Sequence, residues 1–249
     1  MQEISPIPAR AEGEYRLHAM VRALLSPGIW IVLAAQMLLV FSLQWRVPEE
    51  AAPLISTLAI LFTATALMLF FYLQAGAFHA LTQGREALTA GEVIRAGKTV
   101  FAAFVLLILK AGLLFAVVIN ILVFAALLLT GSDLENLTQV ISSYFGPITG
   151  VLAFVFVYWL PWAFVHREFR LLPSLKAALR LARSRLSHSL FPALMVLAPA
   201  LAVGFLPAES PVLIDALVIL ATGIMGWIAY IYCVDVLRQY LPLPDKASA

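Results

Sequence analysis

Apolar residues in this chain come in six long runs that carry almost no charge. The runs cover residues 29–45, 54–81, 100–129, 147–165, 190–206 and 212–237. A helix needs roughly 17 to 25 apolar residues to cross a bilayer, and every run reaches that length or exceeds it. The runs lack the in-and-out alternation of transmembrane barrel strands. The pattern therefore predicts an all-α polytopic membrane protein with six transmembrane helices.

Shorter amphipathic segments precede the first, third and fifth runs, at residues 14–25, 87–98 and 164–190. In them, apolar residues recur at the spacing of one helix face. The order of surface helix, span, short outer link and span thus occurs three times and suggests a threefold repeat. It predicts three hairpins, each preceded by a cytoplasmic amphipathic helix, in a single membrane domain. The expected parts are a flexible arm at 1–13, hairpins at 14–81, 85–165 and 167–240, and a tail at 241–249.

Residues 164–190, with the sequence FVHREFRLLPSLKAALRLARSRLSHSL, form the most basic part of the chain. One acid, Glu168, stands among six cations, which are the candidate ligands of lipid headgroups: Arg167, Arg170, Lys176, Arg180, Arg183 and Arg185. A basic amphipathic helix of this kind is typical of segments that lie flat on a membrane surface.

Helix periodicity separates the apolar from the charged residues of this segment. At about 100° per residue, one face collects the following residues: Leu171, Leu172, Leu175, Ala178, Leu179, Ala182 and Leu186. The cations Lys176, Arg180 and Arg183 fall beside and opposite that face. Two interpretations are open, and both can hold. The helix lies with its leucines in the acyl boundary and its cations among lipid phosphates, or it packs on its own protein.

Composition agrees with a membrane protein. Of the 249 residues, 63% are hydrophobic and 12% are charged, whereas about 25% of the residues of a soluble domain are charged. The single cysteine, Cys233, excludes an intrachain disulfide. The first 16 residues lack an apolar core behind a charged start, so we expect no cleaved signal peptide.

The loop charges predict the orientation of the chain. All but two of the 16 Lys and Arg residues lie in the termini and in the loops after the second and fourth runs. The opposite side carries Arg46 among several acids, and Lys110 lies inside a run. By the positive-inside rule, both termini are expected in the cytoplasm.

Polar residues inside the runs are candidates for function, because charge is costly within a bilayer. The candidates are Lys110, Asn120, Asp215 and Asp235. Counted from Thr99, Lys110 lies about 16 Å deep, close to the middle of the membrane. It could contact a substrate or an anion, or it could extend its amine toward the cytoplasmic surface. Asp235 could instead form an interfacial pair with Arg238.

The sequence lacks the motifs of several classes of enzyme and binding protein. The sequence has no HExxH, GxSxG, phosphate-binding GKT/S, dinucleotide or CxxC motif, and its histidines match no ligand spacing. We therefore expect no catalytic residue, no metal and no cofactor. The cations do not lie on a soluble surface studded with aromatic residues, so we expect no nucleic-acid partner.

The segments REFRLLPSLKAALRLARSRLSHSLFPAL and FHALTQGREALTAGEVIRAGK resemble those before the fifth and third spans of certain bacterial proteins. These are uncharacterised six-helix proteins of the YciC-like type and the membrane domain attached to some glycerophosphodiester phosphodiesterases. The resemblance lies in the layout of the whole chain and offers no catalytic residue. It implies a multi-pass protein of the bacterial inner membrane.

Three classes of function follow from these observations. The first is a non-enzymatic structural or accessory membrane protein that helps envelope homeostasis or assembly of a complex. The second is a small transporter or channel that uses Lys110. The third is a membrane-embedded enzyme that acts on lipid, for which His166, Glu168 and His188 are the candidate residues at one membrane boundary. Expected partners are the bilayer, anionic headgroups, and a membrane protein or a second copy of the chain.

Overall fold

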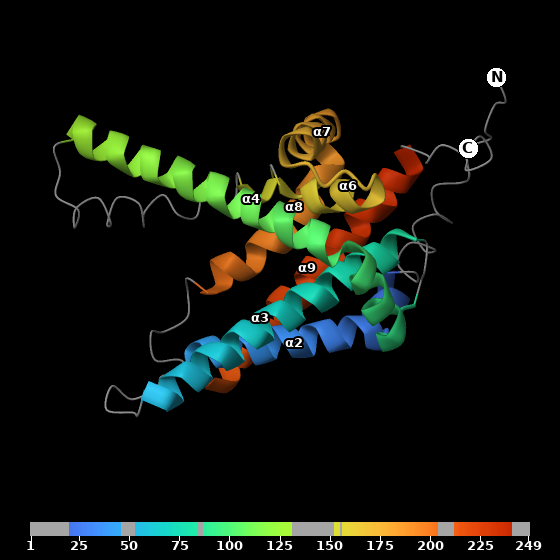
Figure 1. Ribbon diagram of the computed structural model, residues 1–249. Helices are drawn as coiled ribbons and strands as arrows, with labels where there is room; N and C mark the ends of the chain where they lie inside the picture. Colours follow the sequence, from blue (N-terminus) through green and yellow to red (C-terminus); the bar gives the residue numbers. More distant parts are fainter. Residues whose placement is uncertain are drawn as a thin grey trace, which may run out of the picture. The chain divides into compact units, whose positions relative to one another are not determined.

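The computed structural model describes residues 20–45, 53–83, 87–130, 152–154, 156–203 and 212–240, and these contain helices and turns but no strand. The labelled helices are α2 (Pro27–Gln44), α3 (Pro53–Thr82), α4 (Ala90–Thr130), α6 (Trp159–Val165), α7 (Leu171–Ser184), α8 (Leu186–Val203) and α9 (Val212–Tyr240) (Figure 1). The expected all-helical class is confirmed for this part of the chain.

Among the described residues, four helices are long and apolar enough to cross a membrane. They are Pro27–Gln44, Pro53–Thr82, Ala90–Ile121 and Ile214–Arg238. Two shorter apolar stretches are also present: Leu152–Val165 lies within the fourth expected span, and Leu186–Ala198 overlaps the fifth but begins four residues before it. The coarse prediction of a multi-pass helical membrane protein thus agrees with the structure. The first halves of the expected surface helix at 14–25 and of the fourth span lie largely outside the described residues.

The chain divides into two compact units, Met1–Thr99 and Val100–Ala249. The division falls within α4, in the second expected hairpin. The surface segment expected at 87–98 is not a separate helix, because its residues 90–98 continue into the third span as one helix of 41 residues.

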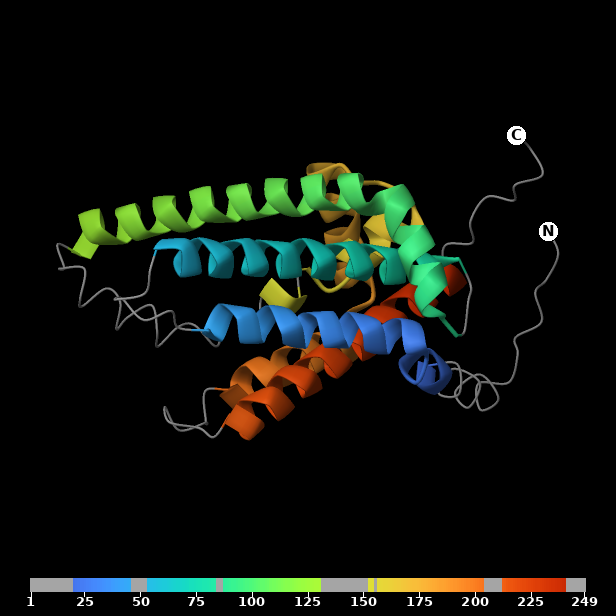
Figure 2. The ribbon, with the colours of Figure 1, turned by 60° about the horizontal axis from the view of Figure 1, so that its bottom comes forward.

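In the first unit, α2 and α3 pack along each other (Figure 2). The Thr63 hydroxyl donates to the Ser42 carbonyl oxygen at 3.4 Å. The rings of Trp45 and Phe62 meet edge to face, with centroids 6.4 Å apart. These contacts join the end of α2 to the middle of α3, so α3 continues beyond α2 with exposed apolar side chains such as Leu54.

The start of α4 crosses α3 at two glycines. A Cβ atom on Gly76 would collide with the carbonyl oxygen of Val93, and one on Gly97 would lie 2.9 Å from the carbonyl oxygen of Tyr72. The Tyr72 hydroxyl donates to the Ile94 carbonyl oxygen at 2.7 Å. The absence of side chains at both glycines lets the two backbones approach closely.

In the second unit, α9 contacts α8 and α6, and α6 also contacts α7. The fully buried side chains include Tyr158, Phe104 and Phe164, and the last two have ring centroids 5.6 Å apart. Large apolar residues of the spanning helices remain exposed outside this core, as expected where lipid is the solvent.

Proline explains a break within the fourth expected span, just before α6. Residues 157 and 158 form a turn, and α6 begins at Trp159. Pro161 has no N–H, and its ring would clash with the carbonyl group of Val157 in a continuous helix. The helix is therefore broken by a turn just before Pro161.

Candidate lipid-headgroup surface

One side of α7 is fixed to the protein by small residues. Ser174, Ala178 and Ala182 recur at every fourth position, and each is at most 1% exposed. Their spacing places them in one line along the helix. Because these side chains are short, α7 contacts α6 closely.

A buried hydrogen bond holds the beginning of α7. The indole N–H of Trp159, in α6, donates to the Ser174 hydroxyl oxygen at 3.0 Å. That hydroxyl also donates to two backbone carbonyl oxygens at the start of α7, that of Arg170 at 2.7 Å and that of Leu171 at 3.1 Å. Ser174 therefore links α6 to the first turn of α7.

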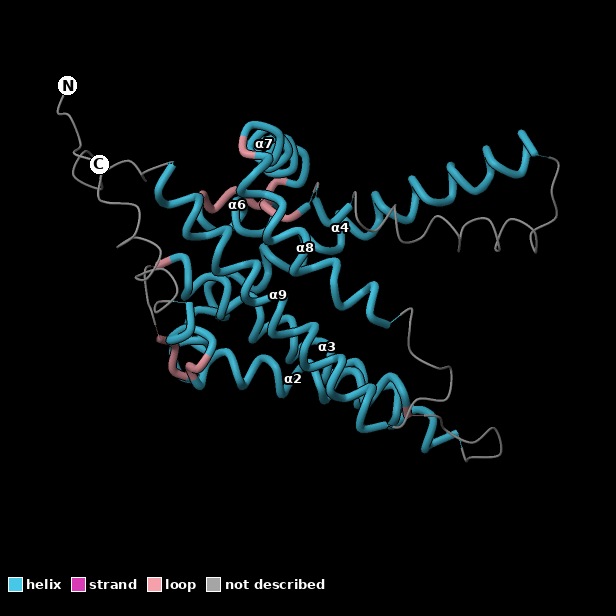
Figure 3. The backbone as a smooth tube through the Cα atoms, turned by 180° about the vertical axis from the view of Figure 1, so that it is seen from behind, coloured by secondary structure: helices cyan, strands magenta, loops and turns pink. Residues whose placement is uncertain are grey.

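The turn between α6 and α7 contains a strained residue (Figure 3). Arg167 has a φ of 52°. No other non-glycine residue in the described part of the chain has a positive φ. The Glu168 N–H donates to the Ala163 carbonyl oxygen at 3.0 Å. This is the bond of a Schellman motif, in which glycine usually occupies the left-handed position.

An exposed ion pair follows this turn. Nε of Arg170 lies 2.7 Å from Oε1 of Glu168, and the Arg170 NH2 group donates to Oε2 at 3.0 Å. Hydrogen bonding to the Arg170 guanidinium lowers the pKa of Glu168, and the same bond raises the pKa of Arg170. Exposed pairs of this kind contribute little stability but restrict side-chain geometry.

His166 ends α6 beneath the turn. Its ring packs against the Trp162 ring with centroids 4.1 Å apart. Its Nε2 atom is buried without a hydrogen-bond partner in the described structure, and burial lowers the pKa of the imidazole.

A serine fixes the corner between α7 and α8. The Ser189 hydroxyl, which is fully buried, donates to the carbonyl oxygens of Arg185 at 2.7 Å and of Ala182 at 3.2 Å. The Ser189 N–H also donates to the Arg185 carbonyl oxygen at 3.0 Å, so this residue joins the end of α7 to the start of α8. The basic segment is therefore one short helix that ends at Ser184, and the residues up to Leu190 belong to the next helix.

The opposite side of α7 is exposed. Leu172 and Leu179 are 68% and 44% exposed, and Lys176 and Arg183 are exposed as well. At about 100° per residue, Leu179 lies about 100° from Ala178, and Arg183 lies about 40° beyond Leu179. The predicted apolar face thus divides into a buried line of small residues and an exposed line of leucines that borders the cations.

All six predicted cations are exposed, and the structure brings them together on α7 and its flanking turns. Arg167 and Arg170 lie in the turn before α7, and Arg185 ends it. Within the part of the chain that the structure describes, Lys176, Arg180 and Arg183 contact no carboxylate.

A polar cluster joins neighbouring helices close to α7. The Tyr158 hydroxyl donates to the His188 carbonyl oxygen at 3.4 Å, and Nδ1 of His188 lies 3.2 Å from the Tyr232 hydroxyl oxygen. The ring of Tyr232 also packs on Phe191, with centroids 5.0 Å apart. These contacts connect the start of α8 with α9.

The structure does not bring the four intramembrane candidates together with this surface. Lys110 and Asn120 are exposed on α4, and the Asn120 amide donates to the carbonyl oxygen of Ala116 in its own helix at 2.8 Å. Asp215 lies in the first turn of α9, and Asp235 lies near its end, where it attracts Arg238.

Two features of the surface were not predicted from the sequence: the Trp159–Ser174 bond and the strained turn at Arg167. The small residues Ser174, Ala178 and Ala182, at every fourth position, are a sequence signal for close helix packing that could have indicated the buried side. Among the described residues, no group of three His, Cys, Asp or Glu could hold a metal ion.

Comparisons with protein-family models, with curated proteins and with solved structures found no match for this chain. The class is therefore defined by the fold itself, which is that of an all-helical membrane protein with several apolar helices of spanning length.

Proposed function

We propose that this chain is a six-span protein of the bacterial inner membrane with both termini in the cytoplasm. In this proposal α7 lies on the cytoplasmic lipid surface and binds anionic headgroups. The role is structural or accessory and non-enzymatic, in envelope homeostasis or in assembly of a membrane complex. The resemblance of the sequence layout to that of YciC-like proteins, and the two shorter apolar stretches that add to the four long helices, support this topology.

The division of α7 into two sides carries the proposal. Small buried residues and the Trp159–Ser174 bond fix the helix to its unit. The exposed side combines leucines with cations that have no acidic partner in the described chain. Leucines in the acyl boundary and cations at the phosphates would satisfy both groups at once. Basic residues near an anionic leaflet contribute about 1 kcal/mol each.

The test uses the full chain in vesicles that contain phosphatidylglycerol and phosphatidylcholine. Energy transfer from the protein's tryptophans to labelled lipids reports which lipid is enriched around it. Wild type should enrich phosphatidylglycerol, and replacing Lys176, Arg180 and Arg183 together with Gln should remove most of that preference. The matched control keeps the charges by exchanging Lys for Arg and Arg for Lys at the same positions, and it should behave as wild type. An unchanged lipid preference in the Gln variant at low salt would refute headgroup binding by α7.

A further inference from the structure

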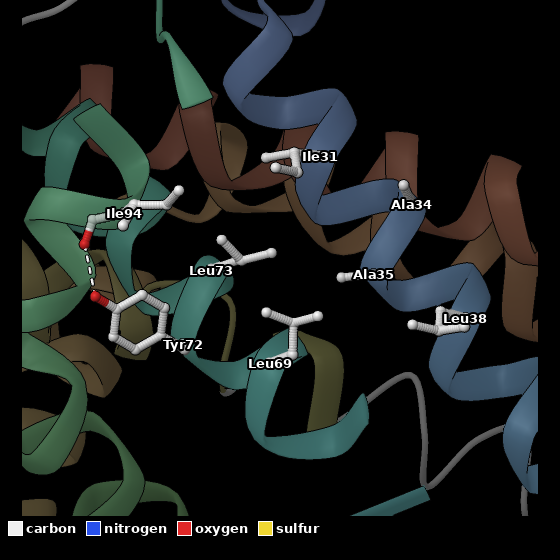
Figure 4. A pocket seen from close by; sticks show the side chains of 8 residues that line it. All are labelled: Ile31, Ala34, Ala35, Leu38, Leu69, Tyr72, Leu73 and Ile94. Atoms are coloured by element: carbon white, nitrogen blue, oxygen red, sulfur yellow. Dashed lines mark hydrogen bonds between the residues drawn. The ribbon is translucent and has the colours of Figure 1, made fainter. Parts of the chain in front are cut away.

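The first unit contains an apolar groove between α2 and α3, of about 440 Å³. One face of α2 lines it, with Ile31, Ala34, Ala35 and Leu38 at the spacing of a single helix side (Figure 4). The space exists because two alanines stand where larger residues would fill it. Ala34 is exposed, and Ala35 is buried.

The other wall consists of Leu69, Tyr72 and Leu73 of α3 together with Ile94 of α4. The only polar side-chain group among the lining residues, the Tyr72 hydroxyl, donates to the Ile94 carbonyl oxygen at 2.7 Å. An apolar occupant would therefore leave no polar side chain of the lining without a hydrogen-bond partner.

The groove lies close to the start of the first span. Trp30, which is 45% exposed, immediately precedes Ile31, and aromatic residues of this kind mark the membrane interface. From Ile31 to Leu38 the groove covers about 10 Å along α2, within the roughly 15 Å depth of one leaflet. In the proposed orientation it therefore opens to the acyl chains of the cytoplasmic leaflet.

Two cations follow Ile94 on α4. Arg95 and Lys98 are both exposed, and Lys98 lies one turn after Ile94 and about 40° around the helix from it. A lysine or arginine here can reach the interface while its aliphatic part stays among apolar groups. In the proposed orientation α4 enters the membrane here, so Arg95 lies almost level with Ile94 and Lys98 lies one turn deeper. The groove thus has an apolar wall for an acyl chain, with two cations beside it for an anionic headgroup.

We propose that this groove is a binding site for one phospholipid of the cytoplasmic leaflet, with an acyl chain between α2 and α3 and an anionic headgroup near Arg95 and Lys98. The site is separate from α7, and it rests on the proposed topology but not on headgroup binding by α7.

The test uses the full chain in nanodiscs with a phosphatidylglycerol probe that carries a photoactivatable group on an acyl chain. Labelled residues are then identified by mass spectrometry. Label should concentrate on the groove relative to other exposed apolar segments. Ala34→Phe fills the groove and should lower this labelling about tenfold, the factor that corresponds to about two buried methylene groups. Arg95→Gln with Lys98→Gln should reduce labelling by this probe more than by its phosphatidylcholine counterpart.

The matched control is Ala64→Phe. Like Ala34, Ala64 is exposed, but it lies on α3 about 140° around the helix from the groove residue Leu69. This variant should label as wild type does, and so should the Gln variant of α7, which separates the two proposals. If the exposed apolar helices of wild type were all labelled equally, that result alone would overturn the groove site. Crosslinks between copies through Ala34→Cys, in place of lipid labelling, would also overturn it.

Discussion

The indole N–H of Trp159 lies 3.0 Å from the hydroxyl oxygen of Ser174, and both groups are buried. Replacing Ser174 with Ala leaves the Trp159 N–H buried without its acceptor, at a cost of about 1–3 kcal/mol. The loss of this hydrogen bond should destabilise the fold less in Trp159→Phe, because the Ser174 hydroxyl keeps its bond to the Arg170 carbonyl oxygen. The same substitution also removes ring volume from the core. We expect Ser174→Ala to lower the unfolding temperature of the purified chain in lipid nanodiscs.

The matched control for this substitution is Ser184→Ala. The Ser184 hydroxyl makes only an exposed bond to the Leu181 carbonyl oxygen at 2.9 Å. This variant should stay within about 0.5 kcal/mol of wild type. Equal losses in both variants would mean that the Trp159–Ser174 bond does not hold α7.

Arg167 occupies a left-handed conformation that favours glycine. Arg167→Gly relieves a conformational cost of about 1–2 kcal/mol, part of which is offset by the greater freedom of glycine in the unfolded chain. We expect a small net rise in the free energy of unfolding together with a modest loss of phosphatidylglycerol enrichment. If this variant is less stable than wild type, then the Arg167 side chain makes contacts that outweigh the strain.

The stability of the α6–α7 turn should depend on pH through His166. Burial lowers the pKa of His166 in the folded chain, so the unfolded chain binds a proton more readily. The stabilisation from the neutral ring is complete above the unfolded pKa of about 6.5, and it falls as the pH drops toward the folded pKa. Unfolding measured from pH 7.5 to 5.5 should show this loss.

His166→Phe keeps a ring against Trp162 and should flatten this part of the pH profile. Glu168→Gln is the control, because hydrogen bonding to Arg170 lowers the pKa of Glu168 and its contribution is lost only at lower pH, near and below about 4.3. A profile that keeps its full slope in His166→Phe would assign the pH dependence to other groups.

The sequence predicted the spanning helices well where one long apolar run forms one helix. The expected first, second and sixth runs match α2, α3 and α9 within three residues at each end. Charge and periodicity also located the basic helix. They could not show that its alanines would face protein and its leucines would stay exposed, because both residue types are apolar. Only contacts between distant residues, such as Trp159 with Ser174, distinguish the two sides.

The depth of Lys110 remains a prediction, and the exposure of α4 bears on it. Phe104 and Leu107 are buried, whereas every residue from Gly112 to Ile121 is exposed. The segment from Lys110 to Leu128 is about 27 Å long, close to the thickness of a bilayer core. We therefore expect Lys110 near the cytoplasmic surface and not at mid-membrane.

A nitroxide label at Lys110→Cys should be shallower than one at Val118→Cys, which lies about 12 Å further along the helix. Collision rates with oxygen and with a water-soluble nickel complex measure the depth. A deeper label at position 110 would restore the mid-membrane site that a transporter needs. Lys110→Leu should then impair function, whereas a surface lysine should tolerate that change.

The same measurement on α7 tests the central claim most directly. Labels at Leu179→Cys and Arg180→Cys are adjacent in sequence but about 100° apart around the helix. In nanodiscs with anionic lipid, the account predicts that the label at position 179 collides mainly with oxygen in the acyl region. The label at position 180 should collide mainly with the nickel complex at the headgroups. Two labels equally open to water, or two labels equally deep in the bilayer, would contradict a surface-lying α7.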